Sequence, residues 1–163
     1  MFDGLNMLYV PQLHVVLHEP QIPPNTGNIG RTCVAVGAKL WLIKPLGFDV
    51  SEKARRRAGL DYWEHLEWEV VESWAEAVAK LAEPLAAGRV WFFSKKATRH
   101  FTDVTYQPGD VLVFGSETIG LPQELLGQYS DQALRIPIRE QVRSLNLSVA
   151  AGIAIYEALR QFG

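Results

Sequence analysis

The residue types best suited to chemistry lie in three segments that are far apart in the chain. The first reads Pro-Pro-Asn-Thr-Gly-Asn-Ile-Gly-Arg over residues 23–31. Small residues and amides at the start of a helix let a ligand approach free backbone N–H groups. Asn28 and Arg31 are three residues apart, so they share one face near that end. The segment is a candidate substrate site, although a well-capped helix with a solvated arginine explains the same residues.

The second segment reads Gly-Ser-Glu-Thr-Ile-Gly-Leu-Pro over residues 115–122 and directly follows an apolar run. Gly115 allows a ligand to lie against the end of a strand, and Gly120 permits a positive φ angle. Glu117 can hold a loop through backbone N–H groups or hydrogen-bond a ligand. A plain turn from a strand into a helix that begins at Pro122 is the structural alternative.

The third segment combines Arg-Ile-Pro-Ile at 135–138 with Arg-Ser-Leu-Asn-Leu-Ser at 143–148. Ser144 or Asn146 can cap the final helix. Together with Arg143 these side chains provide more polar groups than a cap requires, which favours a second ligand-binding role.

Other common chemistries lose support because their motifs are missing. The chain contains no phosphate loop and no G-x-G-x-x-G turn, and Leu121 stands where a phosphate loop needs lysine. Residues 114–118 do not form a nucleophile elbow. Residues 27–30 match the G-x-x-G of an RNA-clamping KH loop, but four residues recur by chance. No metal-ligand spacing links the single cysteine to the histidines, which are Cys33, His14, His18, His65 and His100.

Strand-like and helix-like stretches alternate, and they must position these segments. Strands are predicted at 14–18, 40–43, 65–68, 90–93, 111–114 and 134–136. Helices are predicted from a cap at Asn25 or Thr26 to Val36, and over 51–58, 73–82 and 146–161. This alternation indicates an α/β fold with a mainly parallel sheet flanked by helices. Ligands of such sheets bind beyond the carboxyl ends of the strands.

The last predicted helix is apolar nearly all round. One stripe contains Leu147, Ala151, Ile155 and Leu159, while other faces carry Val149, Ile153 and Tyr156. Such a helix must be covered on more than one side. It is therefore either a central helix or part of a subunit interface.

Composition bounds the remaining possibilities. The 163 residues fit one domain, and the net charge of −2 means that any nucleic-acid binding must come from local basic patches. The single cysteine, Cys33, excludes an internal disulfide and fits a reducing compartment. No apolar run approaches the roughly 20 residues that a membrane span needs, and the N-terminus has no basic region. We therefore expect a cytoplasmic protein without a membrane partner.

The three segments, in this order and spacing, resemble the signature motifs of the SPOUT RNA methyltransferases. The resemblance covers residues 13–163 as one domain and leaves residues 1–12 as an N-terminal extension. Within the family, the chain is similar to the minimal group that methylates the ribose 2′-hydroxyl of the tRNA wobble nucleotide. It implies a C-terminal deep trefoil knot and a homodimer formed through the knot region and the last helix. Gly30, Ile119 and Val149 depart from the family pattern.

The resemblance also implies roles for residues. S-adenosylmethionine is expected to contact the knot loops at Phe93, Gly115, Glu117, Ile136, Ser144, Leu145 and Asn146. Arg31 and Tyr156 match positions implicated in catalysis, although Tyr156 also fits a buried interface aromatic. RNA contacts are expected from Asn28, Arg55, Arg56, Arg57, Lys95 and Arg143, some of which form basic patches that also fit solvated surface.

The implied reaction restricts the role of Arg31. A guanidinium is effectively always protonated, so it cannot readily act as a general base. We expect Arg31 to position the neighbouring phosphate and stabilise the developing alkoxide. The implied substrate is cytidine or modified uridine at position 34, in leucine tRNAs. The alternatives are 2′-O-methylation of another tRNA or rRNA nucleotide, and a non-catalytic knotted RNA-binding module.

Overall fold

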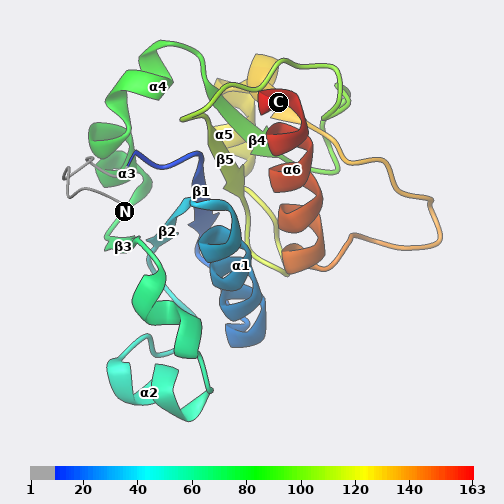
Figure 1. Cartoon of the computed structure of the whole chain (residues 1–163). Helices are drawn as coiled ribbons and strands as arrows, with labels where there is room; N and C mark the ends of the chain where they lie inside the picture. The colour runs from blue at the N-terminus through cyan, green and yellow to red at the C-terminus, as the bar shows by residue number, and fades with distance from the viewer. Residues whose placement is uncertain (1–9) are drawn as a thin grey trace.

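A six-stranded sheet forms the centre of the molecule in the computed structural model, which describes residues 10–163 (Figure 1). Its strands are β1 (His14–His18), β2 (Lys39–Ile43), β3 (Trp68–Val71), β4 (Val90–Phe93), β5 (Val111–Phe114) and β6 (Ala133–Leu134). They lie in the order β3-β2-β1-β5-β4-β6, and every pairing between them is parallel. The predicted parallel α/β sheet is confirmed. The winding reverses between β1 and β5, which is where such sheets bind ligands.

Helices cover both faces of this sheet. The elements are α1 (Pro23–Val36), α2 (Glu52–Arg57), the 3₁₀ helices η1 (Asp61–His65) and η2 (Ser130–Gln132), α3 (Trp74–Lys80), α4 (Ala82–Ala86), α5 (Gln123–Gln128) and α6 (Leu147–Phe162). Val15 and Leu17 of β1 pack into the core under α1, η1 and α6, whereas Val16 packs into the core under α3 and α5. Strand side chains alternate between faces, so continuous apolar strands fill both cores. Figure 1 shows α1 and α6 side by side on one face.

Helix α1 begins earlier than predicted. Its first residues are Pro23 and Pro24, its N-cap is Ile22, and no side chain caps it. Proline suits the first helical turn, because its fixed φ is already helical and its missing N–H needs no partner. The prediction that Asn25 or Thr26 caps the helix is therefore wrong, and both side chains are buried inside it.

The other helix ends mostly follow their predicted signals. Gly37 ends α1 in the left-handed conformation, with φ 72°. Ser51 caps α2 by accepting a hydrogen bond from the N–H of Ala54, and Ser73 caps α3 in the same way through the N–H of Glu76. Of the two candidates for α6, Asn146 is the N-cap and Ser144 is not. Capping chemistry thus predicts these boundaries well.

Three boundaries differ from prediction. The strand predicted at 65–68 lies instead at 68–71, and residues 61–65 form η1. The strand predicted at 134–136 ends at Leu134, while Arg135 makes only an isolated bridge to His100. The helix predicted over 73–82 breaks after Lys80, and Pro84 lies inside the short α4 rather than beyond a helix end. Proline is tolerated there because the first turn of a helix needs no N–H donor.

Tertiary packing explains why the strand predicted at 65–68 begins only at Trp68, after η1. Trp63 and Leu66 are buried against α1, where a Cβ on Gly30 would lie only 2.6 Å from Cζ3 of Trp63. Gly27 and Gly30 are both buried inside a helix that η1 covers. The KH-loop interpretation of residues 27–30 is therefore wrong. The departure from the family pattern at Gly30 makes room for Trp63.

Substituting Gly30→Ala should therefore destabilise the protein. The Trp63 ring is held edge-on against Trp68, at 5.3 Å between ring centroids, so it cannot move away freely. Overpacking of this kind costs about 1–3 kcal/mol. Gly127→Ala is the matched control, because a Cβ there would meet nothing within 4 Å. Urea unfolding should show the loss in Gly30→Ala alone, and equal stability of the two variants would contradict this packing.

A buried histidine makes stability depend on pH. Burial, and then Lys39 and Arg89, lower the pKa of His14 from 6.5 to about 4. Its Nδ1 accepts a hydrogen bond from Nε1 of Trp41, so the neutral form is built into the sheet. The unfolded chain binds a proton at His14 at a higher pH than the folded chain does. The stabilisation of the folded state by neutral His14 is therefore complete above pH 6.5 and is lost as pH falls towards 4.

We predict that the free energy of unfolding of wild type falls by up to about 3 kcal/mol over this pH range relative to His14→Gln, whose side chain does not titrate. Glutamine can still accept a hydrogen bond, so the two proteins should differ in the slope of stability with pH. Urea unfolding at a series of pH values measures that slope. Parallel curves for the two proteins would refute the assignment.

The two sides of α6 have different surroundings. Leu147, Ala151 and Ile155 are buried, whereas Val149, Ile153 and Tyr156 are 50%, 37% and 56% exposed. Positions 149, 153 and 156 follow helical spacing, so these three side chains form one exposed apolar stripe. The α6 stripe, as we call these three residues, is left uncovered by the described residues 10–163, while the opposite side of α6 packs into the core.

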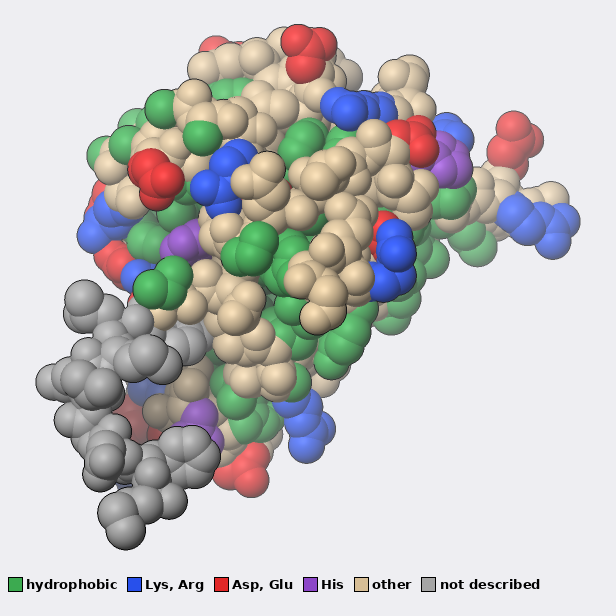
Figure 2. Space-filling view, turned by 45° about the horizontal axis from the view of Figure 1, so that its top comes forward, with side chains coloured by type: hydrophobic (Ala, Val, Ile, Leu, Met, Phe, Trp, Pro, Cys, Tyr) green, Lys and Arg blue, Asp and Glu red, His purple; other side chains and the backbone are tan. Residues whose placement is uncertain are grey.

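The described surface carries mixed charge on the face shown in Figure 2, where acidic, basic and apolar side chains are interspersed. Ion pairs join Lys39 to Glu67 and Glu69, and Arg89 to Asp110. Residues 1–9 of the predicted N-terminal extension lie outside the described residues. Within residues 10–163 no helix is both long and apolar enough to cross a bilayer.

Candidate functional site

A cavity of about 810 Å³ lies at the carboxyl ends of the central strands. Its lining residues follow β1, β4, β5 and β6 and continue into the start of α6. They include Ile22, Asn25, Phe93–Lys96, Phe114–Leu121, Ile136, Ile138, Arg143–Leu147 and Ala150. This is the position where parallel sheets hold ligands, and its size is typical of a small-molecule site.

Glu117 joins two of the three sequence segments. Its carboxylate accepts hydrogen bonds from the backbone N–H groups of Gln21 and Ile22, each at 2.9 Å. It also accepts from Nδ2 of Asn25 at 3.3 Å. These are the donors left free where the chain enters α1, so the acid replaces the missing cap.

These bonds also set the ionisation of Glu117. Burial alone would raise its pKa, but the hydrogen bonds from the backbone and from Asn25 outweigh that effect. The pKa of Glu117 is therefore lower than usual, and the group is a carboxylate at neutral pH. It acts as a structural acceptor and is not available as a general base.

Asn25 and Asn146 connect the third segment. Nδ2 of Asn146 donates to Oδ1 of Asn25 at 3.0 Å, while Oδ1 of Asn146 accepts from the N–H of Ser148 at 2.9 Å. A chain of hydrogen bonds thus runs from Glu117 through Asn25 to the cap of α6. The bridging role of Asn25 was missed from the sequence, where its amide was interpreted as a cap.

At Gly115 the cavity wall is formed by close contact between the backbone of this residue and the backbone of Gly120 and Leu121. A Cβ added there would lie 2.0 Å from the carbonyl carbon of Gly120 and 2.2 Å from the nitrogen of Leu121. Gly120 itself has φ +70°, which lets the loop fold back onto the strand end. Gly115 is needed for the fold of this loop as much as for access by a ligand.

The structure brings all predicted cofactor residues to one place. Phe93, Gly115, Glu117, Ile136, Ser144, Leu145 and Asn146 line the cavity. Two residues predicted to bind RNA, Lys95 and Arg143, line it as well, and Nζ of Lys95 donates to the backbone oxygen of Arg143 at 2.9 Å. This bond joins the loop after β4 to the loop before α6 beside the cavity.

The predicted catalytic residues lie elsewhere. Arg31 and Asn28 are exposed on α1, Tyr156 is exposed on α6, and none of the three lines the cavity. Arg31 is six residues beyond Asn25, or about 9 Å along the helix. Within one chain the cavity and the predicted catalytic groups are therefore separate.

The basic residues of α2 form a third location. Arg56 pairs with Glu52, and Arg55 donates to the backbone oxygen of Val50 while its guanidinium lies over the Trp68 ring. Arg57 is exposed, as is Arg56. The short helix projects from the body of the molecule beside the N-terminal end of α1 (Figure 1).

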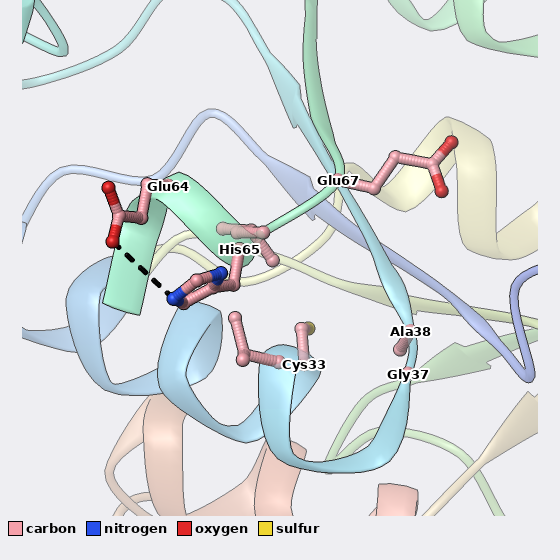
Figure 3. A pocket seen from close by; sticks show the side chains of 8 residues that line it. Cys33, Gly37, Ala38, Glu64, His65 and Glu67 are labelled. Atoms are coloured by element: carbon pink, nitrogen blue, oxygen red, sulfur yellow. Dashed lines mark ion pairs between the residues drawn. The ribbon is translucent and has the colours of Figure 1, made fainter. Parts of the chain in front are cut away.

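A second, smaller hollow of about 450 Å³ lies at the opposite end of α1 (Figure 3). Cys33 and His65 share it, which their sequence positions do not indicate, together with Glu64 and Glu67. Burial raises the pKa of the Cys33 thiol to about 12, so it stays protonated and unreactive. No group of three or more His, Cys, Asp or Glu residues within 10–163 is placed to hold a metal ion. The three polar segments, 23–31, 115–122 and 135–148, contribute residues to the larger cavity, whereas the smaller hollow is lined by residues from 33–38 and 64–67.

A parallel sheet with three polar loops around a small-molecule cavity defines a ligand-binding α/β protein, and sequence comparison identifies its kind. Residues 12–156 match the model of the SpoU rRNA Methylase family, and the chain belongs to this family. Members of the family use S-adenosylmethionine. The match spans the whole sheet and most of α6.

Individual relatives agree with this assignment. The tRNA (cytidine(34)-2′-O)-methyltransferase of Saccharophagus degradans is 48% identical over 151 residues, covering 92% of this chain and 96% of the relative. A structure solved for insight into the 2-OH methylation of C/U34 on tRNA is 44% identical with TM-score 0.83, covering 91% of this chain and 95% of that one. AviRb of Streptomyces viridochromogenes, solved with AdoMet, is 27% identical with TM-score 0.80, covering 98% of this chain and 62% of that one.

Proposed function

We propose that this chain transfers a methyl group from S-adenosylmethionine to the ribose 2′-hydroxyl of nucleotide 34 in tRNA. Relatives with this named activity are 43–48% identical over most of the chain. The observation that carries the proposal is the convergence of all three motif segments on one cavity, joined by the bonds from Glu117 through Asn25 to Asn146. Cytidine is the base in the relatives' names, and leucine tRNAs remain a prediction.

The cavity fits the cofactor. Phe93, Phe114 and Ile136 give it apolar walls that suit an adenine ring, and the loop backbones at Gly115 and Leu145 supply polar groups. The lining also carries charge of both signs, with the Glu117 carboxylate on one side and Lys95 and Arg143 on the other, which suits a ligand that bears a sulfonium and a carboxylate. When bound, S-adenosylmethionine supplies an electrophilic methyl group.

The protein's contribution to catalysis is then mainly positioning. Holding two reactants in line is worth roughly 7–11 kcal/mol of the barrier. We assign to Arg31 the positioning of the phosphate next to the reacting ribose and the stabilisation of the developing alkoxide. Its guanidinium keeps its proton at any working pH, so the hydroxyl proton leaves to water or to the phosphate.

We infer that a second subunit completes the site. Arg31 lies outside the cavity of its own chain, and the α6 stripe is exposed. If a second subunit packs against that stripe, its Arg31 would lie beside the cavity of the first subunit. Exposed apolar stripes of this kind mark interfaces between proteins. The proposed homodimer thus gives Tyr156 an interface position beside the site.

We also infer the trefoil knot. β6 lies at the sheet edge beside β4, whereas α6 packs in the middle against α1 and β5. Residues 135–146 must therefore return across the carboxyl ends of β4 and β5, where the loops 94–101 and 115–121 lie. A chain that passes these loops before docking in the centre has the course that a knot requires.

The experiment is to map the methyl group. Purified protein is incubated with S-adenosylmethionine and an unmethylated leucine tRNA, and nuclease fragments are analysed by mass spectrometry. We expect one added methyl on the ribose of nucleotide 34, and none on a tRNA with a 2′-deoxyribose there. Methylation of another nucleotide would show that the enzyme has a different substrate. The absence of methylation in every RNA tested would favour a non-catalytic RNA-binding module. A cytoplasmic location follows from this substrate and is part of the proposal.

A further inference from the structure

Tyr62 lies between the basic helix α2 and the proposed catalytic helix α1. It belongs to η1, and its hydroxyl donates to the backbone oxygen of Gly27 at 2.6 Å. Its ring faces the guanidinium of Arg31, whose Cζ lies 5.4 Å from the ring centroid. One side chain thus contacts the backbone of α1 and the arginine one turn further along it.

The contact with Tyr62 is the one that directs Arg31. Within residues 10–163, the guanidinium of Arg31 has no hydrogen bond and no ion pair. A long exposed arginine without partners samples many rotamers, and an aromatic face restricts it by a cation–π contact. The stack leaves the N–H donors at the edge of the guanidinium free for a phosphate.

The Tyr62 hydroxyl is suited to anchoring rather than to proton transfer. Burial raises its pKa, against the lowering effect of Arg31, and Asp61 raises it further. The phenol therefore stays protonated at neutral pH and remains a donor to Gly27. This bond adds one further contact between Tyr62 and the helix that carries Arg31.

We propose that Tyr62 is a positioning residue that holds the guanidinium of Arg31 ready for the phosphate beside the reacting ribose. The proposal rests on the proposed function, in which Arg31 acts on the substrate. It also links the reaction to α2, because only the short segment 58–61 separates that basic helix from Tyr62. Loss of the ring should leave the cofactor cavity intact, because Tyr62 is not part of its lining.

The test uses Tyr62→Leu, which removes the ring, and Tyr62→Phe, which keeps it. Misplacing a catalytic group by about 1 Å can cost roughly 100-fold. We expect Tyr62→Leu to lower single-turnover kcat by about 10- to 100-fold with unchanged S-adenosylmethionine affinity, and Tyr62→Phe to stay within about threefold of wild type. In an Arg31→Ala background, Tyr62→Leu should cause no further loss. Tyr129→Leu, which removes a ring stacked on Phe92 at 4.6 Å on the other face of the sheet, controls for general destabilisation.

A second measurement does not depend on activity. In an NMR spectrum, the Nε–H resonance of Arg31 should be shifted by the ring current in wild type and Tyr62→Phe, and should move to its exposed position in Tyr62→Leu. An unshifted resonance in wild type, or equal loss of kcat by Tyr62→Leu with and without Arg31, would overturn the positioning role. A shifted resonance in a protein that methylates no RNA would instead leave this contact in place and refute the proposed function.

Discussion

Adding one carbon at Gly115 is expected to weaken cofactor binding severely. The new Cβ of Gly115→Ala would lie 2.0 Å from the carbonyl carbon of Gly120 and 2.2 Å from the nitrogen of Leu121. Both atoms are backbone, so no rotamer change relieves the clash, and the loop must move into or away from the cavity. We predict that the Kd for S-adenosylmethionine rises by about 100-fold or more, which corresponds to a loss of about 2.7 kcal/mol in binding free energy.

Calorimetric titration measures this change, and a thermal melt establishes that the variant is folded. Gly127→Ala is again the control, because its Cβ meets open space outside the cavity. Near-normal affinity in Gly115→Ala would show that the loop 115–121 does not shape the cofactor site.

Two inactive variants should restore activity when they are paired in one dimer. Arg31→Ala should lower kcat by roughly 10²–10³-fold, as loss of a charge-stabilising group does. Gly115→Ala should fail for lack of cofactor. If each site uses the cavity of one subunit and Arg31 of the other, a heterodimer of the two variants has one complete site and about half of wild-type activity.

Heterodimers purified through two different affinity tags make this comparison direct. Within-chain catalysis would leave one subunit without Arg31 and the other without cofactor, so both sites would be dead. An inactive heterodimer, from subunits shown to exchange and to stay folded, would therefore place Arg31 at the cavity of its own chain. A monomeric wild-type protein would remove the composite site altogether.

The sequence predicted the sheet and its loops because their signals are local. Continuous apolar runs at 90–93 and 111–114 read directly as strands with both faces covered, and Gly37 and Asn146 mark helix ends by their own conformation and side chain. The residues proposed to bind the cofactor came from three long motifs, and the sheet topology brings those motifs to one cavity.

The errors fall where tertiary contacts replace local signals. The start of α1 is stabilised by Glu117, which is more than 90 residues away, so the expected cap at Asn25 or Thr26 is not needed. A strand was predicted at 65–68, yet residues 61–65 form η1, whose aromatic side chains fill the surface that Gly27 and Gly30 leave open on α1. No pattern in the amino-acid sequence indicates the contact between Tyr62 and Arg31.

The sequence also did not show that the residues proposed as catalytic lie apart from the cavity of their own chain. Motif order places Arg31 near the cofactor, but α1 carries it about 9 Å along its axis from Asn25. The sequence pattern also left open whether α6 is a central helix or an interface helix. Within residues 10–163 the structure buries its Leu147 side and leaves Val149, Ile153 and Tyr156 exposed, which supports the proposed interface.

A crystal structure of the protein with S-adenosylhomocysteine tests the central claim most directly. The ligand should lie between Phe93, Gly115 and Ile136, beneath the loop 143–147, with its sulfur facing Arg31 of a second subunit. A ligand bound in the hollow beside Cys33, or a cavity that stays empty at saturating ligand, would contradict the account.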